Sequence, residues 1–183
     1  MLNSLIRIDL HIHSKVSSYK DKGVDMSECD AKHVDVLLDK LTEGEQPIDM
    51  FSLTDHNRFD AGLYEEFYRR ISDRESNIKL LSGVEFDVEL QEGKPAAHII
   101  TIFDAHDARD RAKIQATIEQ DGLIQTESDY YSLDEYESLL RHISLSAILI
   151  VHQHSGFGGN QRKRSAGRAS DDALNLYRYG FFD

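Results

Sequence analysis

Apolar residues recur at two spacings along the chain, every second residue in some segments and every third or fourth in others. The first spacing, or a short apolar run, is typical of a β-strand, and the second is typical of an amphipathic helix. The strand-like segments are residues 5–10, 48–54, 78–90, 98–103 and 147–151. The helical segments are residues 30–41, 60–72, 107–120, 133–142 and 170–179. Strands that alternate with helices favour an α/β fold with a parallel sheet or barrel.

Turn residues separate these segments. Pro47 interrupts the chain between the first helix and the second strand. Residues 92–95 read Glu-Gly-Lys-Pro, so the strand within 78–90 can turn back there as one arm of a hairpin. A loop is expected from residue 153 through residue 168.

The composition is that of a folded domain. The chain has 183 residues, of which 40% are hydrophobic and 30% charged, so one domain with a buried core is expected over residues 1–183. The single cysteine, Cys29, cannot form an intrachain disulfide, and the first residues lack the features of a secretory signal. No apolar run approaches the roughly 20 residues that cross a bilayer. We therefore expect a cytoplasmic protein without a membrane partner.

The charge of the chain is unevenly placed. The formal net charge is −12, which opposes broad attraction to nucleic acid. Cations nevertheless gather within one stretch rich in glycine and serine, at Arg162, Lys163, Arg164 and Arg168. Glycines let backbone amides approach an anion, and arginine forks match phosphate oxygens. We predict that these four residues bind a substrate phosphate, with His154 as a ligand or acid; a solvated surface loop is the alternative.

Histidines and acidic residues stand at or near the ends of the predicted strands. They are His11, His13, Asp55, His56, Glu85, His98 and His152. The C-terminal ends of the strands of a (β/α) barrel meet at one face, so such residues can come together there. Imidazoles and carboxylates bind zinc, manganese and iron, and two histidines two residues apart on a strand point the same way. A carboxylate such as Glu85 can bridge two ions that clamp a phosphate ester.

Each of these patterns also has a structural explanation. Residues 55–57 can form an Asx turn before the next helix. Glu85, Asp87 and Glu89 can be the solvent side of an alternating strand. His98 can cap a strand. The remaining histidines are expected to be structural or solvated: His33, His106 and His142.

Five motifs in order resemble those of the PHP (polymerase and histidinol phosphatase) family, over residues 6 to about 156. They are Asp9-Leu10-His11-Ile12-His13-Ser14, Leu53-Thr54-Asp55-His56-Asn57, Gly83-Val84-Glu85, His98-Ile99-Ile100 and Ile150-Val151-His152. The resemblance implies a distorted seven-stranded (β/α) barrel with two to three divalent ions, commonly manganese, zinc or iron.

The resemblance also implies roles for individual residues. His11, His13 and Glu85 would hold one ion, and Glu85 would bridge to a second ion held by His98 and His152. His56 would serve a third position. Asp9 and Asp55 would act in catalysis by orienting the histidines.

The chain departs from the family pattern in two places. Tyr19 stands where many members have a further His or Asp, with Asp21 and Asp25 close behind. The resemblance therefore does not decide whether this chain has a third metal position. No Asp-x-His motif follows residue 171. Either the chain is the N-terminal piece of a longer protein, as we expect, so that the last strand or strands of the barrel are missing from it, or the barrel itself is incomplete and its metal site weakened. The layout resembles the N-terminal PHP domain of longer proteins in which an ATPase region follows.

The predicted function is metal-dependent hydrolysis of phosphate esters, as a phosphatase or a nuclease. The substrate can be a nucleotide, a phosphorylated small molecule or nucleic acid. One alternative is a degenerate PHP domain that serves as a structural or regulatory module. Another is a metal-dependent amide hydrolase, because barrels of that kind also carry His-x-His after the first strand.

Overall fold

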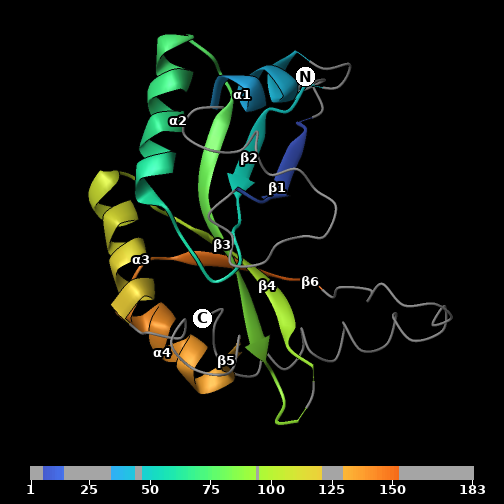
Figure 1. Cartoon of the computed structure of the whole chain (residues 1–183), viewed down its shortest axis with the longest axis vertical. Coiled ribbons are helices and arrows are strands. Elements are labelled where there is room, and N and C mark those ends of the chain that lie inside the picture. The colour runs from blue at the N-terminus through green and yellow to red at the C-terminus, as the bar shows by residue number, and fades with distance from the viewer. Residues whose placement is uncertain (1–5, 15–33, 44–46, 94, 121–129, 153–183) are drawn as a thin grey trace, which may run out of the picture.

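The computed structural model describes residues 6–14, 34–43, 47–93, 95–120 and 130–152 (Figure 1). The strands are β1 (Ile8–Ile12), β2 (Met50–Leu53), β3 (Lys79–Glu89), β4 (Ala97–Phe103), β5 (Tyr131–Ser132) and β6 (Ala147–His152). The helices are α1 (Val34–Thr42), α2 (Ala61–Asp73), α3 (Ala108–Gln120) and α4 (Leu133–Ile143). The predicted strands and the first four predicted helices are confirmed, with shifts at their ends. The two-residue β5 was not predicted, and the helix predicted at 170–179 lies outside the described residues.

The six strands form one mixed sheet. Its order is β1-β2-β3-β4-β6, and β5 pairs with the end of β3. β1, β2 and β3 run parallel, whereas β4 is antiparallel to both β3 and β6. The α/β class and the hairpin are confirmed, and the sheet is mixed where a parallel sheet was favoured, because β4 runs against both of its neighbours. The reason is the short turn after β3, because parallel neighbours need a crossover of a dozen or more residues.

A closed barrel is not formed by the described part of the chain. The order of its strands runs from β1 to β6 without returning, so the sheet is open over these residues. Over these residues the structure shows an open, mixed sheet, and the seven-stranded barrel that the family resemblance implies stays a prediction.

The helices follow one another along one side of the sheet (Figure 1). One hydrophobic core joins them to the strands. Phe51 of β2 meets Phe67 of α2 at 5.8 Å between ring centroids, and Phe86 of β3 meets Tyr136 of α4 at 5.3 Å. Val84 and Phe86 of β3 belong to the same core, so this face of β3 is apolar. Successive residues of a strand alternate in direction, so Glu85 points to the opposite face.

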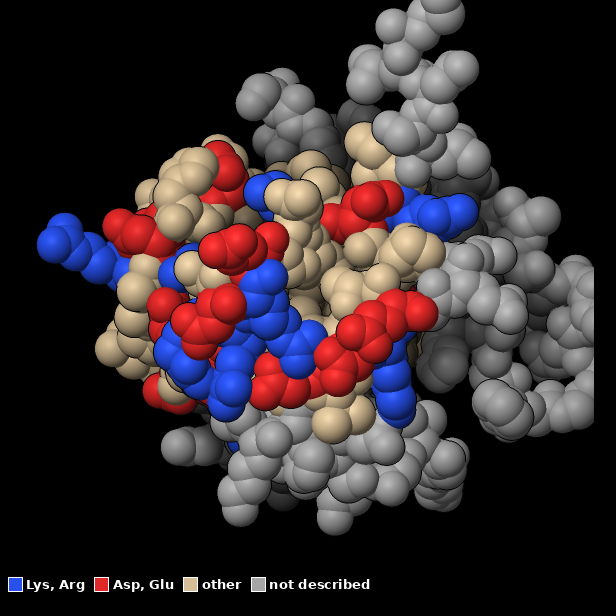
Figure 2. Space-filling model, turned by 90° about the horizontal axis from the view of Figure 1, so that it is seen from above, with Lys and Arg blue, Asp and Glu red and all other residues tan. Residues whose placement is uncertain are grey.

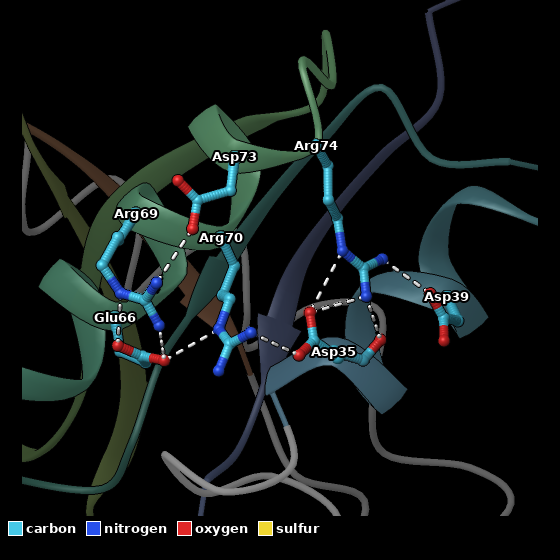
Figure 3. A network of polar contacts seen from close by, with 7 residues as sticks. All are labelled: Asp35, Asp39, Glu66, Arg69, Arg70, Asp73 and Arg74. Carbon is cyan, nitrogen blue, oxygen red and sulfur yellow. Dashed lines mark hydrogen bonds and ion pairs between the residues drawn. The ribbon is translucent and has the colours of Figure 1, made fainter.

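Charged side chains join α1 to α2 (Figure 3). The α1–α2 ion-pair network consists of Asp35, Asp39, Glu66, Arg69, Arg70, Asp73 and Arg74. Arg74 reaches Asp35 and Asp39, each at 2.6 Å, and Arg70 lies 2.9 Å from both Asp35 and Glu66. Both helices are thereby held against each other at their exposed sides.

Acidic and basic side chains are interleaved over the coloured part of the face seen from above (Figure 2). Neither sign of charge forms a continuous field there. None of the described helices has the length and apolar character needed to cross a bilayer.

Candidate metal centre

A buried carboxylate stands at the centre of the histidines. Glu85 of β3 is 1% exposed, and both of its oxygens face imidazole rings. Its Oε2 lies 3.1 Å from His11 Nε2, 3.3 Å from His13 Nε2 and 3.2 Å from His56 Nε2. Its Oε1 lies 2.7 Å from His98 Nδ1. Four rings from three separate segments of the chain therefore meet at one carboxylate.

A bulge in β1 directs His11 and His13 toward this carboxylate. Asp9 pairs with Phe51, but Ile12 pairs with Leu53, so β1 uses one more residue than β2 between the two pairs. Phe51 and Leu53 belong to the helix-covered core, and Ile12 packs against it. Without the extra residue, His11 would stand opposite Leu53 and face the core. The bulge thus moves both histidines to the face of Glu85.

The ends of β1 and β2 are joined by a carboxylate. Asp55 accepts hydrogen bonds from the Ser14 amide at 2.5 Å and from the Ser14 hydroxyl at 2.6 Å. Burial raises the pKa of Asp55 to about 6, although the two bonds from Ser14 act in the opposite direction. Asp9 accepts a hydrogen bond from the His11 amide at 3.1 Å. Both acids therefore act on the segment that carries His11 and His13.

A second carboxylate, Asp87, lies beside Glu85 on the same face of β3. It is 5% exposed, and its oxygens lie 3.5 Å from His56 Nδ1 and 3.5 Å from His98 Nε2. Asn57 donates to Asp87 Oδ2 at 3.2 Å, and its own side-chain oxygen accepts from the Asp87 amide at 3.0 Å. The solvent-facing alternative for Glu85 and Asp87 is therefore wrong, since both are buried.

Two groups of side chains could each hold a metal ion. The first is His11, His13 and Glu85, and the second is His56, Asp87 and His98. Within each group the candidate ligand atoms all lie within 4.8 Å of one another. The rings are also packed closely, since His13 stacks on His56 with 4.8 Å between ring centroids. The two groups touch each other through the contacts of Glu85 with His56 and His98.

The electrostatics of the cluster favour an ionised Glu85. Burial by itself would raise the pKa of Glu85, but hydrogen bonds with His11 and His98 and the charges of His56 and His11 outweigh it and hold the pKa well below its ordinary value. The bond to Glu85 raises the pKa of His11, against the opposing effect of burial. A negative charge is thus held in the interior and faces ring nitrogens, which is the electrostatic setting of a cation site.

The structure brings together most of the residues singled out in the sequence. His11, His13, His56, Glu85 and His98 meet as described, with His98 grouped with His56 and Asp87. The backbone of His152 in β6 pairs with that of His98 in β4, and the His152 side chain lies outside the described part of the chain. Several predicted residues lie outside the described residues: Tyr19, His154, Arg162, Lys163, Arg164 and Arg168.

Asp87 and Asn57 were not identified as site residues from the sequence. The alternation of Glu85, Asp87 and Glu89 placed Asp87 on the face of Glu85, which was the available signal. Asn57 directly follows the Asp-His pair. His106, expected to be solvated, is 77% exposed, counting its side chain alone. His142 stands in the last turn of α4, at the helix end where a structural histidine suits the helix dipole.

Comparisons with known proteins give a limited likeness. No protein-family model matches the chain, and no curated protein does. A solved structure described as a metal-dependent phosphoesterase from Bifidobacterium adolescentis is 12% identical, with a TM-score of 0.48 over 94% of this chain and 75% of that one. An amidohydrolase from Chromobacterium violaceum, solved with sulfate and no metal, is 18% identical, with a TM-score of 0.34 over 73% of this chain and 49% of that one. The chemistry must therefore be inferred from this chain's own side chains.

Proposed function

We propose that this domain binds two divalent metal ions and hydrolyses phosphate esters. The observation that carries the proposal is the buried Glu85 carboxylate, with three imidazole nitrogens around one oxygen and a fourth beside the other. Its two oxygens thereby face both groups of candidate ligands. A carboxylate placed in this way is suited to bridge two cations.

The donor set fits divalent manganese, zinc or iron. Imidazole nitrogens and carboxylate oxygens are the ligands these ions take in proteins, whereas magnesium and calcium prefer oxygen. Two carboxylates, Glu85 and Asp87, are buried side by side in the cluster. Buried anions of this kind need compensating charge, which cations held by the two groups would supply. We propose the His11, His13 and Glu85 group for one ion, and the His56, Asp87 and His98 group for the other.

A pair of bound ions would lower the pKa of a coordinated water toward neutrality and stabilise the attacking and leaving oxygens of an in-line displacement. The chain's own residues contribute position. Glu85 fixes the spacing between the groups, Asp55 and Asp9 hold the His11–Ser14 segment, and Asn57 holds Asp87. Support by such neighbours orients ligands and strengthens their binding of metal.

The substrate would be a phosphorylated small molecule, a nucleotide or nucleic acid. The net charge of −12 favours small substrates, because a long polyanion would be repelled. Arg162, Lys163, Arg164 and Arg168 are proposed to bind the substrate phosphate, and His154 to assist as ligand or acid. A following ATPase region stays a proposal about a longer protein.

Elemental analysis and a phosphatase assay test the proposal together. We expect about two ions per chain in protein purified with manganese, zinc or iron, and hydrolysis of p-nitrophenyl phosphate or its diester. Glu85→Gln keeps the side-chain shape but removes the charge, and should reduce activity at least about a hundredfold, beyond the usual effect of a residue outside the ligand set. Glu119→Gln, on the exposed side of α3, is the matched control and should leave both readouts unchanged.

Other results would identify a different function. Bound metal with hydrolysis of amides and none of phosphate esters would indicate an amide hydrolase. Protein that takes up no metal even when it is supplied would contradict the proposal and favour a structural or regulatory module.

A further inference from the structure

We propose that Tyr64 is a positioning residue for the metal centre, because its hydroxyl is inserted between β2 and β3 immediately before His56 and Glu85. The inference rests on the proposed metal centre and adds to it a residue of α2 that touches none of the candidate ligands in the contacts described here. The hydroxyl of Tyr64 would set the distance between β2 and β3 at the site.

The hydroxyl takes the place of a backbone hydrogen bond. β2 and β3 are paired in one parallel register, with Leu53 opposite Ser82 at the end of β2. In that register the Gly83 amide would donate to the Leu53 carbonyl. Instead the Gly83 amide donates to the Tyr64 hydroxyl at 2.9 Å, and the hydroxyl donates to the Leu53 carbonyl at 2.5 Å.

The ladder resumes one step later, at the site itself. The Glu85 amide donates to the Asp55 carbonyl at 3.2 Å, and the Asn57 amide donates to the Glu85 carbonyl at 2.8 Å. These two bonds form an isolated parallel bridge between His56 and Glu85 in the same register as the rest of β2 and β3. The inserted hydroxyl therefore separates the regular ladder from the bridge that carries two candidate ligands.

Only a group that both donates and accepts can fill this position. A phenolic hydroxyl does both, as a water molecule would. The Tyr64 ring is 2% exposed and stacks on Phe59 with 4.5 Å between centroids, so α2 fixes where the hydroxyl lies. Burial raises the pKa of the Tyr64 phenol far above its ordinary value, which keeps the proton available for the Leu53 carbonyl.

Gly83 completes the arrangement. A Cβ at this position would meet Ser52 Oγ and would lie 2.8 Å from Ile102 Cδ1 and 2.9 Å from Thr54 Cγ2. Glycine thus lets the strands approach on the site face, while the hydroxyl holds them apart in the ladder. The two features together set how far His56 stands from Glu85.

Loss of the hydroxyl has two structural outcomes, and both disturb the site. If the strands stay apart, the Leu53 carbonyl and the Gly83 amide are left buried without this partner, which is unfavourable. If the strands close to bond directly, the chain from Thr54 to His56 moves toward β3. The first outcome weakens the ladder directly beside the bridge between His56 and Glu85, and the second changes the 3.2 Å contact between His56 Nε2 and Glu85 Oε2.

Tyr64→Phe in the whole chain tests the inference. The probe is Co²⁺ alone, titrated at a temperature at which each variant is folded, with its visible absorption as the signature of the ligand geometry. We expect Co²⁺ affinity to fall by about ten- to a hundredfold, the usual effect of a residue that supports metal ligands, and the absorption bands to change.

Two controls separate positioning from stability. Tyr68→Phe removes a hydroxyl of the same helix, which donates to the Leu80 carbonyl at 2.8 Å where the ladder is unbroken. Tyr136→Phe removes a fully buried hydroxyl that lies 2.7 Å from Thr101 Oγ1. Both should lower the stability and leave Co²⁺ affinity and spectrum as in the wild type.

The outcomes are distinguishable. Wild-type protein that binds Co²⁺, with Tyr64→Phe equal to it in affinity and spectrum, overturns the inference and leaves the proposed function standing. Wild-type protein that binds no Co²⁺ overturns both. If Tyr64→Phe does not fold, hydrogen exchange of the wild type decides. The Gly83 amide should then exchange as slowly as the Glu85 amide. Rapid exchange of the Gly83 amide would show that the Tyr64 hydroxyl does not hold it, and would overturn the inference.

Discussion

Asn57 shows how much of the site depends on a single residue. Its φ of 50° lies in the left-handed region, which asparagine tolerates better than most residues. Its backbone amide bonds the Glu85 carbonyl, and its side chain makes two hydrogen bonds to Asp87. Asn57 thus holds the backbone of Glu85 in place and orients the side chain of Asp87.

We predict that Asn57→Asp empties the second metal group and spares the first. The change removes the donor to Asp87 and places a second negative charge beside it, which repels Asp87 from its present position. Elemental analysis should find about one ion per chain where the wild type holds two. Asn77→Asp makes the same change of charge at an exposed loop position and should keep both ions. Two ions in Asn57→Asp would show that Asp87 needs no such support.

The sequence identified the histidines and Glu85 more readily than Asp87. A lone His-x-His pair has a structural explanation as readily as a functional one, and Glu85, Asp87 and Glu89 repeat with the spacing of a solvated strand face. The order of several motifs along the chain singled out the histidines and Glu85, and Asp87 belongs to none of those motifs. What separates the two explanations is burial, and that depends on four histidines contributed by distant segments. The local pattern contains no information about such long-range contacts.

At the scale of elements, the type of each segment was predictable, but the register in which β1 pairs with β2 was not. α2 was expected at residues 60–72 and is observed at Ala61–Asp73, where Asp60 caps it by accepting from the Leu63 amide. β1 was expected as a regular alternation at residues 5–10. Its bulge shifts the register against β2 and decides which face His11 occupies, and no residue type in this segment signals that.

The α1–α2 ion-pair network should make stability depend on pH in the acid range. Hydrogen bonds from Arg69 and Arg70 lower the pKa of Glu66 from 4.5 to about 2. Because the pKa of Glu66 is lower in the folded protein than in the unfolded chain, the ionised Glu66 stabilises the fold fully at a pH above about 4.5. This stabilisation is lost as the pH falls toward 2. Urea midpoints of the wild type should therefore exceed those of Glu66→Gln at pH 7, and the difference should vanish between about pH 4.5 and 2.

Salt provides the check on this explanation. The side chains of the network are exposed or partly exposed, so 1 M salt should screen them and reduce the difference between wild type and Glu66→Gln at pH 7. A difference that persists at pH 2, or that is insensitive to salt, would mean that Glu66 acts through packing instead.

For the whole molecule, the candidate site joins the two halves of the sheet. His11 and His56 come from the parallel side, Asp87 lies on β3 where the two halves meet, and His98 lies on the antiparallel β4. Whether the described strands form a closed barrel or an open sheet could not be read from the spacing of strands and helices, because that spacing is the same whichever way β4 and β6 run. The convergence of the strand ends was nevertheless anticipated, because parallel β1, β2 and β3 place their C-terminal ends together.

Because the ligands span both halves, bound metal should stabilise the entire fold. A ligand that binds only the folded state contributes about 2.7 kcal/mol at a hundred times its Kd. For a chain of this size we expect a rise in Tm of roughly 5 to 10 °C per ion, at about 2–4 °C per kcal/mol. Thermal scans with added Mn²⁺ or Zn²⁺ should show the rise, and a chelator should reverse it. His11→Ala should lose much of the shift, whereas His106→Ala, a solvated histidine of the same type, should retain it. A wild-type Tm that is indifferent to metal would mean that the cluster holds its four rings and two carboxylates together without an ion.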